Sequence, residues 1–308
     1  MDRFGLIGAS GYIAPRHMEA VKNIGGELVT ILDPNDSVGV IDRYHPKATY
    51  FSEYERFDRE VDRLRRMGKG LDYISIASPN YLHDAHIRFA LKNGSHAICE
   101  KPLVLNPYSI SSLEELQVET GKNIYPILQL RLHQSIIDLK EKVGKKKDNK
   151  VELNYVTPRG KWYHYSWKGD EVKSGGIATN IGIHFFDMLL WIFGDIKEVQ
   201  VHSKTNSKVS GYIEFTKARV RWFLSIDEND LPDSVRKTGQ RTHRSIKVDN
   251  SEIEFSSGFD DLHTESYKNI LLGKGFGLED ARKSIELVHN VRNSRIIKSS
   301  SFKHSFLK

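Results

Sequence analysis

Glycines near the start of the chain have the types and spacing of a dinucleotide-binding turn. The segment from Gly8 to Ala14 follows a short apolar run and reads G-x-x-G-x-x-A. Glycines let a backbone turn sharply and approach a pyrophosphate, and the N–H groups that open the following helix attract its charge. The first gap holds one more residue than in the standard G-x-G-x-x-G, so the segment taken alone also fits a purely structural turn.

A carboxylate gives the second signal. Asp33 ends the next apolar run, roughly 20 residues after the turn, where an acid can hydrogen-bond the adenosine ribose hydroxyls. It would also repel a 2′-phosphate, which favours NAD over NADP. Pro34 and Asn35 follow, so Asp33 equally fits the start of a turn. With strand, glycines, helix and acid together, we expect NAD to be bound by Gly8, Gly11, Tyr12, Ile13 and Asp33.

Polar residues also follow the later apolar runs of the first 130 residues. Ser78 and Asn80 follow one run, Glu100 and Lys101 the next, and Arg131 the last. The carboxyl ends of strands in an open parallel sheet are where such sheets bind ligands. We therefore expect further contacts to the cofactor from Ser78, Asn80, His83, Glu100 and Lys101.

The elements that must position these residues change in character at residue 130. Residues 1–130 alternate strand and helix patterns, which predicts an α/β Rossmann domain with a parallel sheet covered on both faces. Residues 131–308 contain longer runs that alternate apolar and polar residues, interrupted by a helix near residues 178–193 and closed by helices near 260–272 and 278–297. This pattern predicts an α+β domain with a large, open, mostly antiparallel sheet for substrate binding and oligomerisation. The Ser- and Lys-rich last dozen residues are expected to be loosely held.

Composition narrows the class of protein. The chain of 308 residues is 39% hydrophobic and 28% charged, with a net charge of +6. No apolar stretch is long enough to span a membrane, the start leaves no room for a signal peptide, and Cys99 is the one cysteine, so we expect a cytoplasmic protein without a membrane partner. The lysine run at 145–147 is typical of a solvated loop. Without zinc-ligand spacing or an RNA-binding signature, we expect no metal and no nucleic-acid partner.

Four segments in order resemble the glucose–fructose oxidoreductase / inositol dehydrogenase / MocA family. They are residues 7–17, SPNYLH at 78–83, EKPL at 100–103 and GIHFFD at 182–187. The E-K-P element combined with G-x-H-x-x-D is specific, and the matches span most of the chain. The resemblance implies an NAD-dependent sugar dehydrogenase with Lys101 and His184 as its catalytic pair.

The chemistry of these two side chains is compatible with that role. Oxidising a secondary alcohol needs a hydride acceptor and a base; a lysine can stabilise the developing alkoxide, and a histidine titrates near neutrality. Which of Lys101 and His184 takes the proton stays open. Taken alone, Lys101 would also fit an ordinary surface lysine, and His184 would also fit a hydrogen-bonded histidine of the core.

Further segments resemble a narrower group within the family, which oxidises the C3 hydroxyl of UDP-N-acetylglucosaminuronic acid to the 3-keto sugar in bacterial O-antigen and lipopolysaccharide synthesis. They include SWKGD at 166–170, ATNIG at 178–182 and ARVRWFL at 218–224. Many family members have Asp where this chain has Asn180; an amide is neither acid nor base, so position 180 is expected to bind substrate. The resemblance leaves open whether 2-oxoglutarate recycles NAD, and whether the protein is a homodimer or a homotetramer.

A UDP-sugar acid carries two phosphates and a carboxylate, so its pocket should be rich in basic and aromatic residues. We expect it to be bound by Arg159, Tyr163, Lys168, Asn180 and His184. The aromatic residues equally suit sheet packing. Two other functions stay open: a dehydrogenase of another sugar or inositol, and a non-catalytic NAD-binding regulatory protein.

Overall fold

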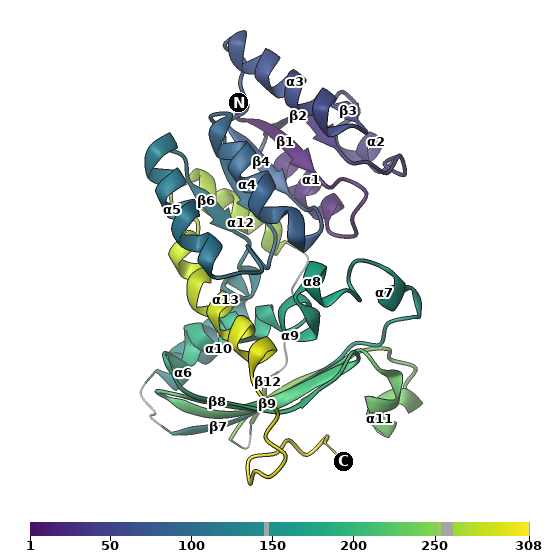
Figure 1. Ribbon diagram of the computed structural model, residues 1–308, viewed down its shortest axis with the longest axis vertical. Helices are drawn as coiled ribbons and strands as arrows, with labels where there is room; N and C mark the ends of the chain where they lie inside the picture. Colours follow the sequence, from purple (N-terminus) through teal and green to yellow (C-terminus); the bar gives the residue numbers. More distant parts are fainter. Residues whose placement is uncertain (145–147, 250, 254–260, 308) are drawn as a thin grey trace. The chain divides into compact units, whose positions relative to one another are not determined.

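The computed structural model describes residues 1–144, 148–249, 251–253 and 261–307 (Figure 1). The lysine run at 145–147 lies outside this set. The chain divides into two units, Met1–Gln129 with Asp260–Arg282, and Leu130–Phe259 with Lys283–Lys308.

A six-stranded parallel sheet forms the centre of the first unit. Its strands lie in the order β3-β2-β1-β4-β5-β6. The chain reverses its direction of travel across the sheet between β1 and β4, the switch point at which open α/β sheets bind ligands. The predicted Rossmann fold is confirmed. The strands are β1 (Arg3–Ile7), β2 (Glu27–Leu32), β3 (Thr49–Phe51), β4 (Tyr73–Ile76), β5 (His96–Cys99) and β6 (Ile124–Pro126).

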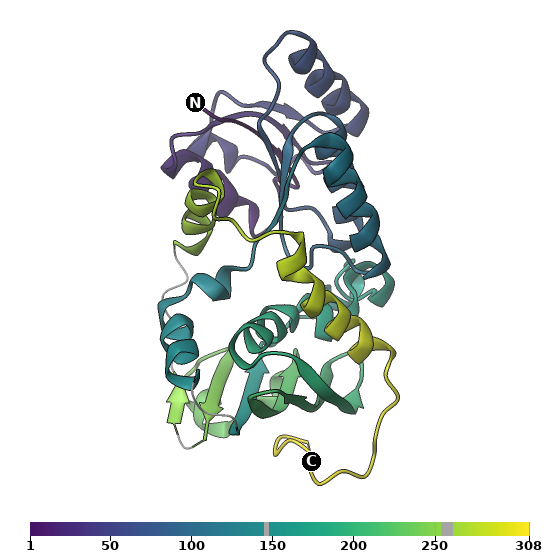
Figure 2. The ribbon, with the colours of Figure 1, turned by 90° about the vertical axis from the view of Figure 1, so that its left-hand side faces the viewer.

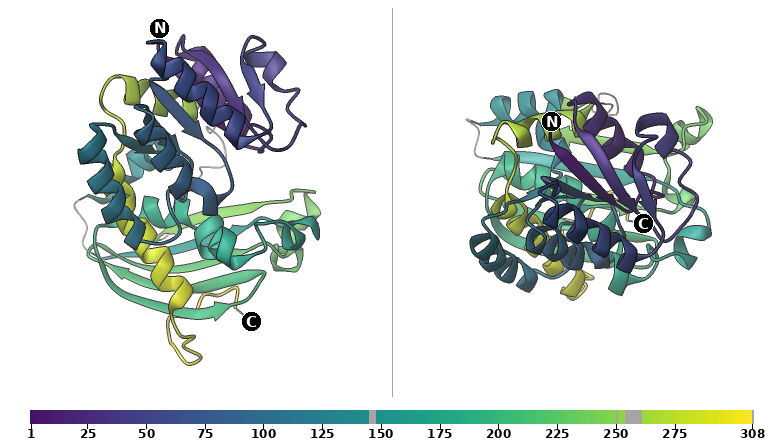
Figure 3. Two further views of the ribbon diagram at one scale, coloured as in Figure 1. Left: turned by 45° about the horizontal axis from the view of Figure 1, so that its top comes forward. Right: turned by 90° about the horizontal axis from the view of Figure 1, so that it is seen from above.

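Helices cover both faces of this sheet because its strands are apolar on both sides. In Figure 2, α1 (Ala14–Asn23) lies on one side, and α3 (Tyr54–Arg66), α4 (His83–Lys92) and α5 (Tyr108–Thr120) lie on the other. The left panel of Figure 3 shows α3 in front of the purple strands. The short α2 (Ile41–Tyr44) follows β2.

A helix from late in the sequence completes the first unit. In α12 (Leu262–Leu271), Tyr267 and Ile270 are buried in the same core cluster as Phe4 and Met18, beside α1. The change of pattern at residue 130 predicts that all of residues 131–308 belong to the second domain. The difference arises because the core contacts of α12 join residues far apart in the sequence, which periodicity within the helix does not reveal.

The second unit contains a sheet of six described strands in the order β12-β11-β7-β10-β9-β8. All pairings are antiparallel except that of β7 with β10, so the predicted mostly antiparallel sheet is confirmed. Its strands are β7 (Asn149–Val156), β8 (Ile196–Lys204), β9 (Lys208–Phe215), β10 (Ala218–Ser225), β11 (His243–Val248) and β12 (Ser251–Ile253).

One apolar helix covers one face of this sheet. In α10 (Ile183–Phe193), the ring of Phe186 lies 5.1 Å from that of Trp222 on β10. The other helices are α6 (Gln134–Val143), α7 (Trp162–Tyr165), α8 (Glu171–Ser174), α9 (Gly176–Asn180), α11 (Asp233–Lys237) and α13 (Leu278–Asn293), the last of which crosses the division between the units. Among the described residues no single helix is long and apolar enough to span a bilayer, while the bent pair Glu171–Asn180 and Ile183–Phe193 meets that test together.

The C-terminal tail packs on the other face of the second sheet (Figure 2). Side chains alternate along a strand, so Phe223 faces away from α10. Its ring lies 5.5 Å from that of Phe306 and 5.7 Å from that of the buried His304, and Phe302 stacks on Tyr212 at 4.4 Å. The expectation of a loosely held tail was wrong. Its aromatic rings pack on an apolar face of the sheet, and amino-acid composition alone does not predict such a contact.

Candidate active site

The turn after β1 has the geometry of a dinucleotide cradle. Gly8 has φ of +96°, and a Cβ added there would lie 2.5 Å from the backbone of Ala77 and Ser78. Only glycine fits, since both the conformation and the space exclude a side chain. Gly11 lies within the same turn, Tyr12 is exposed, and Ile13 precedes α1 without a side-chain cap. The N–H groups of Ala14 and Arg16 donate to the carbonyls of Gly11 and Ile13, so this helix start attracts an anion through the helix dipole.

Asp33 joins this turn to the end of β2. Its Oδ2 accepts hydrogen bonds from the backbone N and the Oγ of Ser10, at 2.8 and 2.9 Å, and its Oδ1 accepts one from the backbone N of Asn35 at 2.8 Å. A carboxylate has about four acceptor positions, so capacity for a ribose hydroxyl remains. Asp33 therefore begins a turn and is also suited to a ribose.

The residues that follow β4 form hydrogen bonds at the carboxyl edge of the same sheet. The Oγ of Ser78 lies 2.9 Å from Nδ1 of His86. His83 lies between two backbone carbonyls: Nε2 is 2.8 Å from the oxygen of Ser78 and Nδ1 is 2.7 Å from that of Pro102. The ring of His83 thus lies between the loops after β4 and β5, and in its neutral form it donates its one N–H to one of the two carbonyls. Its direct contact to the cofactor, like that of the buried Asn80, stays a prediction.

Glu100 lies at the centre of a buried hydrogen-bonded network. Its Oε1 is 2.8 Å from Nε2 of His263 on α12 and 3.2 Å from Nε2 of His17 on α1. Nδ1 of His17 lies 2.7 Å from the hydroxyl of Tyr267, which is 2.5 Å from the Oγ of Ser75. Sequence patterns indicate no role for His17, His263 or Tyr267, and no motif includes the last two.

Burial and hydrogen bonding act in opposite directions on this network. Burial alone would raise the pKa of Glu100, but hydrogen bonds from His17 and His263 hold that pKa well below its usual value. Burial lowers the pKa of His17 and raises the pKa of Tyr267. The network therefore combines an ionised carboxylate at Glu100 with neutral rings at His17 and Tyr267.

Lys101 follows Glu100 directly at the end of β5. Its side chain is half-buried, and its backbone N–H donates to Oε2 of Glu100 at 3.2 Å. The Lys101–Pro102 peptide bond is cis. Lys101, the candidate catalytic amine, thus lies between two buried residues, Glu100 and Pro102, which both form hydrogen bonds.

In the second unit, His184 lies in the first turn of α10 and is half-buried. The same helix carries Asp187, which forms a buried, bidentate ion pair with Arg131 at 2.8 and 3.0 Å. Asp187 ends the G-x-H-x-x-D segment, but its partner could not be inferred from spacing. This pair joins the first turn of the second unit, at Gln129–Leu132, to the helix that bears His184.

Two of the predicted substrate residues are hydrogen-bonded to each other. Nδ2 of Asn180 donates to the hydroxyl of Tyr163 at 2.9 Å, and both residues are buried. Lys168 Nζ lies 5.3 and 5.2 Å from the ring centres of Trp162 and Trp167.

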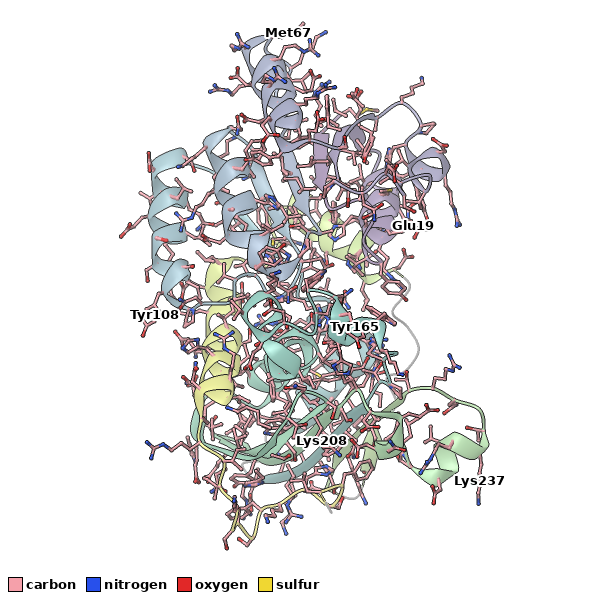
Figure 4. All side chains as sticks on the ribbon, turned by 45° about the vertical axis from the view of Figure 1, so that its right-hand side comes forward. Glu19, Met67, Tyr108, Tyr165, Lys208 and Lys237 are labelled. Carbon is pink, nitrogen blue, oxygen red and sulfur yellow. The ribbon has the colours of Figure 1, made fainter. Side chains whose placement is uncertain are left out.

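The rest of this segment faces solvent. Arg159 is exposed, and so is Tyr165 on α7, which Figure 4 labels. Among the predicted substrate residues, Tyr163, Asn180 and Lys168 thus contact other side chains of the second unit.

Two family models match the chain. Residues 3–127 match the oxidoreductase family with an NAD-binding Rossmann fold, and residues 147–230 match the C-terminal alpha/beta domain of the same GFO/IDH/MocA family. The first match covers the cradle, Asp33 and Lys101, and the second covers His184 and the predicted substrate residues.

The chain is also similar over its full length to the WlbA (WbpB) dehydrogenase of Thermus thermophilus. A crystal structure of that enzyme with NAD and alpha-ketoglutarate is 52% identical, covers 100% of both chains and has a TM-score of 0.97. Another with NAD and UDP-GlcNAcA is 51% identical with the same coverage and TM-score. The glucose-6-phosphate 3-dehydrogenase of Bacillus subtilis is 27% identical over 68% of this chain, which spans 59% of that relative's length. The chain therefore belongs to the GFO/IDH/MocA family of oxidoreductases, as its motifs predict.

Proposed function

We propose that this protein is an NAD-dependent dehydrogenase that oxidises the C3 hydroxyl of UDP-N-acetylglucosaminuronic acid to the 3-keto sugar. The observation that carries the proposal is the full-length similarity, at 51% identity, to a dehydrogenase crystallised with NAD and UDP-GlcNAcA. The bacterial O-antigen or lipopolysaccharide pathway is the setting that the proposal implies.

The first unit fits NAD. Gly8 provides the close backbone approach for a pyrophosphate, the start of α1 provides the positive end of a helix dipole, and Asp33 retains acceptor capacity for a ribose hydroxyl. When bound, NAD supplies the acceptor for the hydride that leaves C3.

Lys101 and His184 handle the hydroxyl group in this proposal. The C3–H bond breaks with its electron pair, the hydroxyl proton passes to a base, and the C3–O bond becomes a carbonyl. A lysine amine beside the hydroxyl stabilises the developing alkoxide, and a histidine can take the proton. The reverse assignment of these roles satisfies the same balance, and the pH dependence of the Lys101→Met and His184→Asn variants decides between them.

Charge and hydrogen bonding favour an anionic nucleotide sugar over a neutral one. Lys168 lies half-buried beside two indole rings, and Arg159 provides a second cation for phosphate or carboxylate groups. Asn180, which donates to the hydroxyl of Tyr163, is the residue that we expect to bind a sugar hydroxyl. A neutral inositol would need no such cations.

We further propose that 2-oxoglutarate takes the hydride from the reduced cofactor, takes a proton on its keto oxygen, and leaves as 2-hydroxyglutarate. The support is the complex of the Thermus thermophilus enzyme with NAD and alpha-ketoglutarate. We also propose a cytoplasmic enzyme, in keeping with the free, buried Cys99, that assembles as a homodimer or a homotetramer.

The test is to incubate the protein with NAD and UDP-N-acetylglucosaminuronic acid, with and without 2-oxoglutarate, and to follow the loss of two hydrogen atoms from the sugar by mass spectrometry. The Lys101→Met variant is the matched control, and myo-inositol and glucose 6-phosphate are the competing substrates. Turnover of the UDP-sugar supports the proposal. Turnover of inositol alone, or NAD binding without turnover of any substrate, would refute it in favour of one of the two alternatives.

A further inference from the structure

Glu100 is a buried carboxylate with hydrogen-bonding partners on three separate segments. It is 6% exposed, and its partners, direct or through His17, are His17 on α1, His263 and Tyr267 on α12, and the backbone N–H of Lys101. An ionised carboxylate in a dry interior is destabilising unless its acceptor positions are filled. The network must therefore supply donors, and this fixes where its protons lie.

The direction of each hydrogen bond follows from the carboxylate outward. Because ionised Glu100 can only accept, His17 and His263 each donate an Nε2–H to Oε1. The neutral ring of His17 then presents a bare Nδ1, which accepts from the hydroxyl of Tyr267, and the oxygen of Tyr267 accepts from Ser75. Each hydrogen bond of this network then has one donor and one acceptor, and the network carries a single negative charge, on Glu100.

The backbone on the other side of Lys101 is held as well. The carbonyl oxygen of Pro102 lies 2.7 Å from Nδ1 of His83, whose Nε2 reaches the carbonyl of Ser78 at 2.8 Å. Lys101 is therefore preceded by a residue tied to α1 and α12 and followed by one tied to the loop after β4.

We propose that His17, His263 and Tyr267 are positioning residues, which lock the carboxylate of Glu100 so that it anchors the backbone of Lys101 at the end of β5. This inference rests on the proposed function, in which the Lys101 amine acts on the substrate hydroxyl. A displacement of about 1 Å at a reacting group can lower a rate by about 100-fold, so an anchor of this kind bears on kcat.

A divalent cation is the competing occupant of these atoms. The ligand atoms of His17, Glu100 and His263 all lie within 4.8 Å of one another, and two imidazoles with one carboxylate can bind a metal. A metal would need bare Nε2 atoms on both rings, whereas the hydrogen-bonded network needs protons there. The Nε2 protons therefore separate the two explanations.

The first arm of the test is nitrogen NMR of the full chain labelled on histidine, without ligands, with resonances assigned from His17→Gln and His263→Gln. The proposal predicts a proton on Nε2 of both rings and a bare Nδ1 on His17. A bare Nε2 on either ring, or a metal found in stoichiometric amount by elemental analysis, would overturn the proposal. This arm does not depend on turnover.

The second arm compares two substitutions of His263. Leu keeps the bulk but removes the donor, whereas Gln keeps an N–H group at a similar reach. We expect His263→Leu to lower kcat by about 10- to 100-fold with KM changed less than about 3-fold, and His263→Gln to keep most of kcat. The amide resonance of Lys101 should shift in His263→Leu and stay in place in His263→Gln.

Equal kcat and an unmoved Lys101 amide in both variants would overturn the positioning role. If His263→Leu does not fold, the histidine spectrum of the unaltered protein and the His263→Gln variant still decide. A protein with the predicted tautomers that turns over no UDP-sugar contradicts the proposed function alone.

Discussion

Replacing Gly8 by Ala tests the dinucleotide cradle where the structure makes the sharpest prediction. The new Cβ would stand 2.5 Å from the carbonyl carbon of Ala77 and from the nitrogen of Ser78, and both are backbone atoms that cannot rotate away. The residue would also keep a φ of +96°. We expect the conformation to cost about 1–2 kcal/mol and the overlap about 1–3 kcal/mol more.

Gly25 provides the matched control. Its φ is +73°, and a Cβ added there would meet nothing within 4 Å, so Gly25→Ala isolates the conformational contribution. The difference between the two variants in free energy of unfolding, measured by urea denaturation, then reports the overlap alone. NAD affinity, measured by calorimetry, should fall in Gly8→Ala and change less than about 2-fold in Gly25→Ala, because only the former reshapes the turn. Gly8→Ala with the stability and NAD affinity of Gly25→Ala would refute this account of the turn.

Three further predictions concern buried polar groups. Asp187→Asn should destabilise the protein by about 3–5 kcal/mol because it removes the negative charge that compensates the buried Arg131. Replacing both residues by apolar ones should destabilise the protein much less than the sum of the two single changes. Additive free energies of unfolding, measured by urea denaturation, would show that the two residues do not interact. Burial lowers the pKa of His86 from 6.5 to about 4, so between these values the unfolded chain binds a proton that the folded chain does not. The free energy of unfolding should therefore fall by about 2 kcal/mol from pH 7 to pH 5 because of this residue. His86→Gln should remove that part of the decline, and an unchanged decline in the variant would contradict this role of His86. Tyr163→Phe removes the hydroxyl that accepts from the Asn180 amide, and KM for the UDP-sugar should rise about 2- to 10-fold. Unchanged steady-state kinetics would mean that this hydrogen bond does not orient Asn180.

The first unit could be predicted from sequence wherever the signals were local. Alternating strand and helix patterns gave the parallel sheet, and the glycine turn with Asp33 gave the cradle. The sequence is compatible with Asp33 either starting a turn or binding a ribose hydroxyl. The hydrogen bonds that its carboxylate accepts from Ser10 and Asn35 leave it able to do both. Local sequence predicts a backbone conformation well because few residues determine it.

Contacts between distant segments could not be predicted in the same way. Helical periodicity indicated a helix near residues 260–272, but nothing in it showed that Tyr267 lies against Phe4 or that His263 reaches Glu100. The bidentate pair of Arg131 and Asp187 was equally hidden, since a single sequence does not reveal which charges meet in the interior. The roles of Lys101 and His184 came from family resemblance and stay predictions until variants are measured.

Hydride transfer from C3 is the central claim, and isotopic labelling measures it most directly. The protein would be incubated with NAD and UDP-N-acetylglucosaminuronic acid deuterated at C3, and the nucleotide and sugar products analysed by mass spectrometry. The account predicts that deuterium leaves the sugar and appears on the reduced nicotinamide, and that Lys101→Met slows the transfer by at least about 100-fold. Deuterium retained in the sugar, or transfer at an unchanged rate in Lys101→Met, would contradict it.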